Sequence, residues 1–319
     1  MEQKVVCVAQ WADTMDGAII ETEDGSVFNV ETNEDGECKL SRLESQEFME
    51  PCAWVTGLKN PSLHDAESEN NDPFENEAGR TSLVFGLSHR SRLFFHDVLL
   101  ADAVSSLFVS VSHRYLCYIT AQGSTSQLRF LPFRDLQSFD TLMGSDGNIM
   151  LEGYEPRSVE RGARLVAILP GSPSAIIQVP RGNLEAFFPR ALVLRFVMKK
   201  ITSGDYFTAF AMMRKQKVNL NLIVDLNPQK FLDVGLSLFL QQVSAIDHLN
   251  LFISCLQNWD CTHAQYKIPH WLTNLVPEAD WEAKKLFDFH SKVNQVCLKM
   301  RELMIAAENE RRLMGAKKF

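Results

Sequence analysis

The stretch QVPRGNLEAFFPRALVLRFVMKKITSGDYFTAFAMMRKQKVNLNLIVDLN, residues 178–227, contains the change that decides the fold. Before Pro189 the apolar residues fall in short runs, and after it they recur at helical spacing. The period of the pattern thus changes from 2 to 3.6, which separates strands from helices. The sequence predicts a β-rich domain over residues 1–187 and a helical domain over residues 188–319.

Short apolar runs between turn signals predict antiparallel strands in the first domain. Asp-Gly turns lie at 16–17 and 24–25, just before the apolar runs 18–22 and 26–31. They predict that these two runs form a hairpin, because Gly tolerates positive φ. About ten or eleven strands would form fewer than three four-stranded propeller blades, with a sandwich or barrel as alternatives. The runs lie at 3–9, 18–22, 26–31, 82–88, 92–97, 106–111, 115–120, 126–131, 163–170 and 175–180.

Five helices on short loops are predicted in the second domain, as in an α-solenoid. Ser203 is the expected N-cap of the second helix, and Asn227 with Pro228 begins the third. The predicted ranges are 191–201, 203–216, 228–243, 246–257 and 281–313. The side chains expected to face neighbouring helices are Phe207, Phe210, Leu220, Leu222, Phe231 and Leu232. The last helix carries an expected apolar stripe of Val293, Val296, Met300, Leu303 and Met304.

Charge is distributed unevenly along the 319 residues, whose net charge is −8. Residues 1–80 carry 19 acidic and 5 basic residues, and residues 190–319 carry 12 acidic and 18 basic residues. Residues 60–80, with six acids and one base, are predicted to be an exposed acidic loop. Seven cysteines without a CxxC pair indicate reduced thiols. With no predicted membrane span, the expected location is the cytoplasm, and the nucleus is a further location that the sequence allows.

Three groups of residues are candidates for sites of chemistry. Cys255, Cys261 and His263 have no standard zinc spacing and lack a fourth ligand. Ser112 beside His113, and His96 beside Asp97, are not accompanied by a nucleophile elbow. We therefore predict no catalytic residue, no cofactor-binding residue and no metal ligand in this chain.

Basic residues gather near the ends of the first two predicted helices. They could contact RNA phosphates or a protein partner weakly. The alternative is that they complement the helix dipoles and keep the surface solvated. The residues are Lys199, Lys200, Arg214, Lys215 and Lys217.

Several blocks of this sequence resemble the largest subunit of the Elongator complex, the IKAP family. They occur in the family's order and cover about two-thirds of the chain. The blocks are LVFGLSHRSRLFFHD (83–97), VERGARLVAILPGSPSAIIQVPRGNLE (159–185), RALVLRFVMKKI (190–201), FTAFAMMRKQKVNLNLIVDLNPQKFL (207–232), HLNLFISCL (248–256) and KVNQVCLKMRELM (292–304).

The resemblance implies a fold and a function. The fold would be the end of a second WD40-type β-propeller followed by the start of a TPR-like α-solenoid. The function would be that of a non-catalytic scaffold, supporting the modification of tRNA wobble uridine to 5-carbonylmethyluridine-type products. The expected partners are other Elongator subunits, including the catalytic one, and tRNA indirectly or weakly. Neither a membrane nor a small-molecule substrate is expected.

Other functions fit the predicted fold, because fold does not fix function. The first is a propeller-plus-solenoid coat or trafficking scaffold without a role in tRNA chemistry. The second is a hydrolase in the β-rich domain, although no nucleophile motif supports it.

The family's first propeller, its far solenoid and its basic tRNA-contacting segment have no counterpart in the matched blocks.

Overall fold

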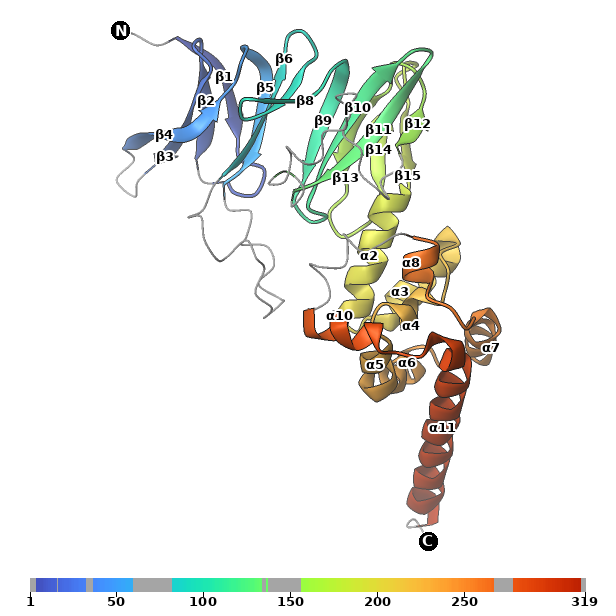
Figure 1. Cartoon of the computed structure of the whole chain (residues 1–319). Helices are drawn as coiled ribbons and strands as arrows, with labels where there is room; N and C mark the ends of the chain where they lie inside the picture. The colour runs from blue at the N-terminus through green and yellow to red at the C-terminus, as the bar shows by residue number, and fades with distance from the viewer. Residues whose placement is uncertain are drawn as a thin grey trace. The chain divides into compact units, whose positions relative to one another are not determined.

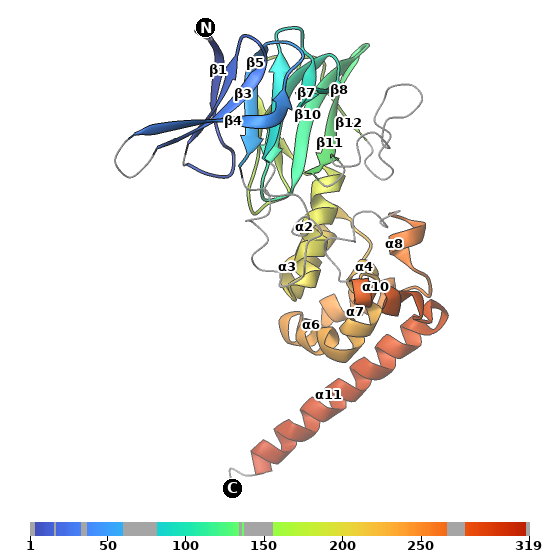
Figure 2. The ribbon, with the colours of Figure 1, turned by 60° about the vertical axis from the view of Figure 1, so that its left-hand side comes forward.

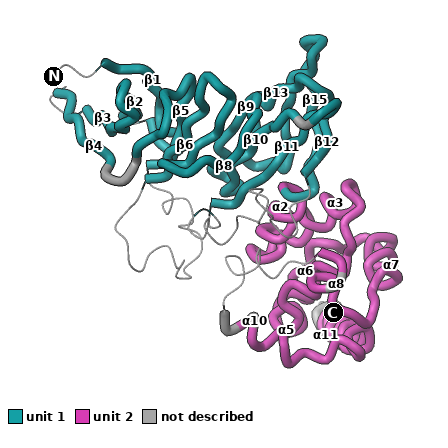
Figure 3. Tube along the Cα trace, turned by 45° about the horizontal axis from the view of Figure 1, so that its top comes forward, with its two compact units in different colours: residues 1–191 teal, residues 192–319 magenta. Residues whose placement is uncertain are grey.

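The chain folds into two compact units, Met1–Ala191 and Leu192–Phe319 (Figure 3). The computed structural model describes residues 4–15, 17–32, 37–59, 82–133, 136, 156–266 and 278–316. The first unit is built of strands and the second of helices, which confirms the predicted order of β before α. The predicted acidic loop at 60–80 lies outside the described residues.

Fifteen strands in the described part of the first unit form four antiparallel sheets in chain order (Figure 1). The first sheet contains β1 (Val5–Gln10), β2 (Ala18–Thr22), β3 (Ser26–Thr32) and β4 (Cys38–Glu47). The second contains β5 (Cys52–Leu58), β6 (Leu83–Ser88), β7 (Leu93–Phe95) and β8 (Val98–Ala101). The third contains β9 (Val104–Ser110), β10 (Tyr115–Gln122), β11 (Thr125–Pro132) and β12 (Arg157–Val159). The fourth contains β13 (Arg164–Ile168), β14 (Ala175–Gln178) and β15 (Leu184–Phe187).

The predicted number of strands was therefore wrong. Five strands were missed, namely β4, β5, β8, β12 and β15. Four of these are either rich in charge, as in CKLSRLESQE of β4, or only three to four residues long. Their strand conformation comes from pairing with a neighbour rather than from their own apolar pattern. The predicted hairpin of β2 and β3 is confirmed, and Gly25 turns it at φ +84°.

Successive sheets pack face to face around apolar cores. β1 packs against β5 and β9 against β13, so the first strand of a sheet lies on the first strand of the next. The core between the first two sheets includes Trp11, Ile19, Val27, Val55 and Phe94. The core between the second and third includes Phe85, Phe95, Leu107, Leu116 and Phe133. Between the third and fourth, Leu165 donates its N–H to Ser106 Oγ at 2.7 Å.

A buried carboxyl group lies in the first of these cores. Glu21 on β2 is fully buried, and its carboxyl oxygens accept the Cys52 N–H at 3.0 and 3.2 Å. Burial raises the pKa of Glu21 to about 7, although the hydrogen bond from Cys52 opposes the rise. The group thus changes charge near neutral pH inside the fold.

The second unit is built of helices, joined by short connections where the chain is described. α2 (Arg190–Thr202) and α3 (Tyr206–Gln216) come first, followed by the short α4 (Leu222–Asp225). One continuous helix then contains α5 (Pro228–Lys230), the π-helical segment η4 (Phe231–Gly235) and α6 (Leu236–Gln242). The remaining elements are α7 (Ile246–Cys255), α8 (Cys261–Ala264), α10 (Glu278–Lys285), the 3-10 turn η5 (Phe289–Ser291) and α11 (Lys292–Ala316).

Two of the predicted helix boundaries need correction. Asp205, not Ser203, caps α3, because its side chain accepts the Thr208 N–H at 3.2 Å. Ser203 instead donates to Lys200 O at the end of α2. The predicted helix over 281–313 is two helices, α10 and α11, separated by η5. The prediction of Asn227 as N-cap with Pro228 at the first helical position is confirmed.

Aromatic rings form the core of the helical unit. Tyr206, Phe210, Phe231, Phe239 and Phe252 form a chain of ring pairs with centroids 4.6–6.3 Å apart. Such edge and tilted pairs add to the stability that burial gives. The glycine in the π-helical segment makes room for them, because a methyl group at Gly235 would lie 2.3 Å from the Tyr206 hydroxyl oxygen.

Most of the residues predicted to face neighbouring helices are buried. Phe210, Leu220, Leu222 and Phe231 are buried, and Leu232 is half-buried. Phe207 is 54% exposed, so its predicted burial was wrong. On α11, the stripe is buried at Val296 and Met300 and half-buried at Val293 and Leu303, whereas Met304 is exposed. The stripe becomes exposed because α11 extends past the other helices of its unit (Figure 2).

Replacing Phe210 tests the aromatic core. Phe210→Ala removes a ring that is 1% exposed and is expected to lower the free energy of unfolding by about 3–5 kcal/mol. Phe207→Ala on the same helix is the matched control and is expected to change it by about 0.5 kcal/mol or less. Denaturant unfolding followed by circular dichroism measures both. Equal effects of the two substitutions would contradict this packing.

Titrating Glu21 tests the buried carboxyl group. An unfolded glutamate titrates near about 4.3, so between roughly pH 4.5 and 7 the folded chain binds more protons than the unfolded chain. Stability from this group therefore falls as pH rises, by up to about 1.4 kcal/mol per pH unit. The Glu21→Gln side chain stays neutral, so the free energy of unfolding of this variant relative to the unmodified chain is expected to rise by about 2.5 kcal/mol from pH 5 to 8. Glu23→Gln, at an exposed turn, is the control, and parallel curves for Glu21→Gln would refute the assignment.

Candidate functional site

A buried ion pair lies at the centre of the helical unit. Asp225 ends α4 and Lys292 begins α11; both side chains are fully buried, with Nζ 2.7 Å from Oδ1. Lys292 Nζ also donates to Trp259 O at 2.7 Å, and Asp225 Oδ2 accepts the Cys261 N–H at 2.9 Å. These contacts hold α4, α8, α11 and the segment before α8 in one arrangement.

A second charged pair lies beside the first. Lys284 on α10 is 3.1 Å from the carboxylate of Asp260, which also caps α8, and it donates to Thr262 Oγ1. Burial raises the pKa of Asp225, and the nearby charge of Lys292 opposes the rise. Burial likewise lowers the pKa of Lys284, whereas Asp260 opposes it. Each charge is matched inside the protein, which indicates a structural rather than a chemical role.

Two asparagines that precede Asp225 connect further segments to the same region. Asn219 Nδ2 donates to Gln265 Oε1 at 2.8 Å, and its backbone N–H donates to the Tyr266 hydroxyl at 2.9 Å. The buried Asn221 donates to Cys255 O and accepts the Gln257 N–H, at 2.8 and 2.9 Å. The polar residues of NLNLIVDLN therefore connect to segments 34 or more residues away.

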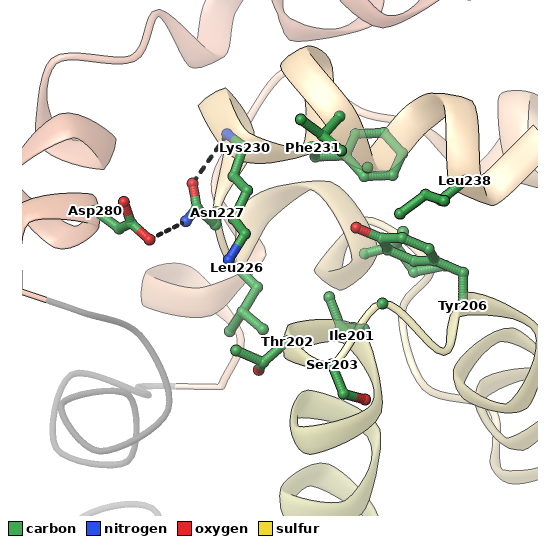
Figure 4. Close-up of a pocket in the computed structure, with 14 residues that line it drawn as sticks. Ile201, Thr202, Ser203, Tyr206, Leu226, Asn227, Lys230, Phe231, Leu238 and Asp280 are labelled. Atoms are coloured by element: carbon green, nitrogen blue, oxygen red, sulfur yellow. Dashed lines mark hydrogen bonds between the residues drawn. The ribbon is translucent and has the colours of Figure 1, made fainter. Parts of the chain in front are cut away.

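A pocket of about 210 Å³ lies between α2, α4, η4 and α10 (Figure 4). Its apolar wall includes Ile201, Ile223, Phe231 and Leu238, with the Tyr206 ring beside them. At its polar side, Asn227 donates to Asp280 at 2.9 Å and accepts the Lys230 backbone N–H at 3.1 Å. Asn227, which caps α5, thus also joins the helix to α10. The pocket combines a packing space with a helix cap, and both Lys230 and Asp280 are among its lining residues.

The five predicted contact residues lie in two groups rather than one. Lys200 Nζ is 3.0 Å from the carboxylate of Asp205, the N-cap of α3, so Lys199 and Lys200 lie near the beginning of α3. Arg214 and Lys215 lie in its last turn and Lys217 caps it at φ 52°. An 11-residue helix separates the two groups by about 16 Å.

The second group borders an open groove of about 630 Å³ between α3, α7 and α8. Arg214 and Lys217 line it together with Asn219, Gln257 and Gln265. Arg214 Nη1 is 2.6 Å from His248 Nε2, which must accept this hydrogen bond. The groove has the cations and amides that a phosphate or carboxylate could meet, and Lys199 and Lys200 do not line it.

The candidate residues for catalysis or metal binding have the burial and contacts of residues that stabilise a fold. His113 is buried, with Nδ1 3.0 Å from both Ser110 Oγ and Ser112 Oγ. Burial lowers the pKa of His96 to about 4. Cys261 is buried and His263 is exposed. Within the described ranges, no three His, Cys, Asp or Glu side chains gather as a metal site would require. No described helix is both long and apolar enough to cross a membrane.

Sequence analysis missed the buried pair of Asp225 and Lys292. One signal was present, because Asp225 interrupts the apolar run LIVDL, where an exposed position is not expected. The partner was not evident, since 67 residues separate Lys292 from Asp225. Such a pair is found only when the fold brings distant segments together.

Both units of the chain match families of known proteins. Residues 1–166 match the family described as ELP1 N-terminal second beta-propeller, and residues 190–316 match the ELP1 alpha-solenoid family. The chain is 32% identical to Elongator complex protein 1 of Saccharomyces cerevisiae over 293 residues, covering 88% of this chain.

The chain belongs to the Elongator complex protein 1 family. It is also 36% identical to the Rattus norvegicus member over 191 residues and 26% identical to the Arabidopsis thaliana member over 280 residues, covering 60% and 84% of this chain. The matched region spans 20% of the yeast and plant relatives and 14% of the rat relative. The resemblance to this family, and the partial propeller followed by a solenoid, are thus confirmed. The buried pair, the pocket and the groove all lie within the solenoid match, residues 190–316.

Removing one member of the buried pair tests its structural role. Lys292→Met leaves Asp225 buried without its cation and is expected to lower the free energy of unfolding by about 3–5 kcal/mol. Adding Asp225→Leu is expected to restore most of the loss, because no uncompensated charge remains. Lys299→Met, on the exposed side of α11, is the control. Chemical denaturation measures all three, and a double variant no more stable than Lys292→Met would contradict the coupling.

Proposed function

We propose that this chain is a scaffold segment of the Elongator complex and catalyses no reaction itself. The observation that carries the proposal is that one family's propeller and solenoid match the two units in order, over residues 1–166 and 190–316. The relatives bear the name Elongator complex protein 1. The charged residues at the centre of the helical unit support a structural role, since they are paired and buried.

The proposed biological role is support of tRNA wobble-uridine modification of the 5-carbonylmethyluridine type. In this role the chain binds other Elongator subunits, including the catalytic one, in the cytoplasm or the nucleus. Propeller and solenoid surfaces serve such assembly well, because stacked repeats present extended binding surfaces. Contact with tRNA is indirect or weak. It involves the two basic groups near the ends of α3.

Affinity capture tests the scaffold role. The tagged chain expressed in a eukaryotic cell is expected to retain Elongator subunits, the catalytic one among them. Lys292→Met, which disturbs the helical unit, is expected to retain less of them than the Lys299→Met control. Recovery of membrane-coat components in place of Elongator subunits would instead support a trafficking scaffold and contradict the proposal.

Salt titration tests the RNA contact. If the three cations Arg214, Lys215 and Lys217 each meet a phosphate, tRNA affinity is expected to fall roughly 40-fold between about 50 and 200 mM salt. Changing all three to Ala is expected to weaken binding at low salt and to flatten this dependence. The control pair Lys299→Ala and Arg301→Ala removes two cations from α11. Gel-shift titration measures these, and tight binding at physiological salt lost in the triple variant would show a strong RNA site instead.

A further inference from the structure

The groove between α3, α7 and α8 is positively charged. Residues 211–224, 248–259 and 261–266, which contain every described residue of its lining, carry three lysines or arginines and no Asp or Glu. Two helices, α3 and α7, end beside the groove, and each helix end carries about half a negative charge. Arg214 and Lys217, the cations that line it, therefore outweigh the two helix dipoles.

The amide groups that line the groove use their oxygens within the protein. Gln257 Oε1 accepts the Trp259 Nε1–H at 2.7 Å, and Gln265 Oε1 accepts from Asn219 Nδ2 at 2.8 Å. Asn219 Oδ1 accepts both the backbone N–H and the Nδ2 of Asn221, at 3.0 and 2.8 Å. Both glutamines are exposed, and among the described residues neither of their NH2 groups has an acceptor. Cations and amide donors together suit a ligand that only accepts hydrogen bonds, namely an ionised carboxylate or a phosphate.

Lys217 has a backbone conformation that favours glycine. It ends α3 at φ 52° and ψ 45°, and no other described non-glycine residue of the helical unit has a positive φ. Glycine adopts this left-handed conformation most readily at a helix end, because a Cβ is unfavourable there. Backbone strain of this kind is concentrated at ligand-binding sites. The strain therefore fits a role of the lysine side chain in binding rather than in stability.

The apolar part of the lining favours a peptide over RNA. Leu251 is 36% exposed and lines the groove with the half-buried Cys255 and the buried Val218. Aliphatic side chains can pack on an apolar side chain of a peptide, whereas single-stranded RNA is bound by aromatic rings that stack on its bases. Among the described residues that line the groove, none is aromatic. Its volume of about 630 Å³ is within the range of binding sites for small ligands, which suits a short peptide segment.

We propose that this groove binds an acidic peptide segment of a protein partner. A carboxylate of the peptide accepts hydrogen bonds from Arg214 and Lys217, and the NH2 groups of the two glutamines donate to its further oxygens. An aliphatic side chain of the same segment packs on Leu251. Charge complementarity steers the segment to the groove. The proposal goes beyond the scaffold role, because it names a ligand class for one surface and does not depend on which complex contains the chain.

Peptide selection by the full chain tests the ligand class. A phage library of random heptapeptides is passed over the immobilised chain at physiological salt. The expected result is enrichment of peptides with Asp or Glu close to Leu, Ile, Val or Met. The same library passed over the Gln257→Glu variant is expected not to enrich them, because a carboxylate in the groove repels that of the peptide.

Fluorescence anisotropy of a labelled selected peptide then compares matched variants. Gln257→Glu keeps an acceptor for Trp259 but replaces the NH2 donor, and it is expected to weaken binding at least about tenfold, as the loss of one hydrogen bond to a charged group does. Lys217→Gly is expected to weaken binding similarly, while its thermal midpoint stays the same or rises because the backbone strain is relieved. Gln241→Glu, at an exposed glutamine of α6 outside the groove lining, is the matched control and is expected to bind as the unmodified chain does.

Three results would overturn the proposal. Enrichment of peptides without acidic residues, or of none at all, would show that the groove does not recognise a peptide carboxylate. Equal affinities of Gln257→Glu and Gln241→Glu would place the peptide elsewhere on the chain. Loss of tRNA binding in Gln257→Glu without any peptide binding would make the groove an RNA site. None of these results decides the scaffold role, which affinity capture of Elongator subunits tests separately.

Discussion

The helical unit depends on one buried ion pair. Asp225 and Lys292 come from helices that are distant in sequence, and neither is in contact with water. Burying two charges costs more than their attraction returns unless other hydrogen bonds complete them. Trp259 O and the Cys261 N–H supply those bonds, so the pair is satisfied in only one arrangement of the surrounding segments. The pair therefore selects a particular packing of the solenoid helices, whereas apolar contacts alone would tolerate several.

The strand unit is organised by a different constraint, which is the coverage of sheet faces. Each inner sheet buries apolar residues on both sides, so alternation of apolar and polar residues is lost along strands such as β6 and β10. Within this apolar environment Glu21 keeps its carboxyl group near the Cys52 N–H, and burial raises its pKa. The unit thus accepts a titratable carboxyl group among apolar core residues, and it also buries His113 and Arg114.

The buried and the surface polar side chains of the described residues differ in their surroundings. The side chains with the chemistry for catalysis, such as His113 and Asp225, are buried and hydrogen-bonded within the fold. The basic residues near the two ends of α3 differ from one another in their surroundings. Lys200 is paired with Asp205, whereas Arg214 contacts a histidine beside an open groove. The proposed scaffold role requires such surfaces to be held at fixed positions, and the buried network connects the segments of the helical unit.

The sequence by itself determined the order of β before α, the strands with strong apolar patterns, and the cap of α5 at Asn227, because these depend on residues close together in the chain. Only the tertiary structure decided that β4 and β15 are strands, that Asp205 replaces Ser203 as a cap, and that the last helix divides at η5. The buried pair of Asp225 and Lys292 also became visible only in the fold. In each of these cases a partner distant in sequence, or a competition between neighbouring caps, settles the outcome, and local periodicity contains no information about either.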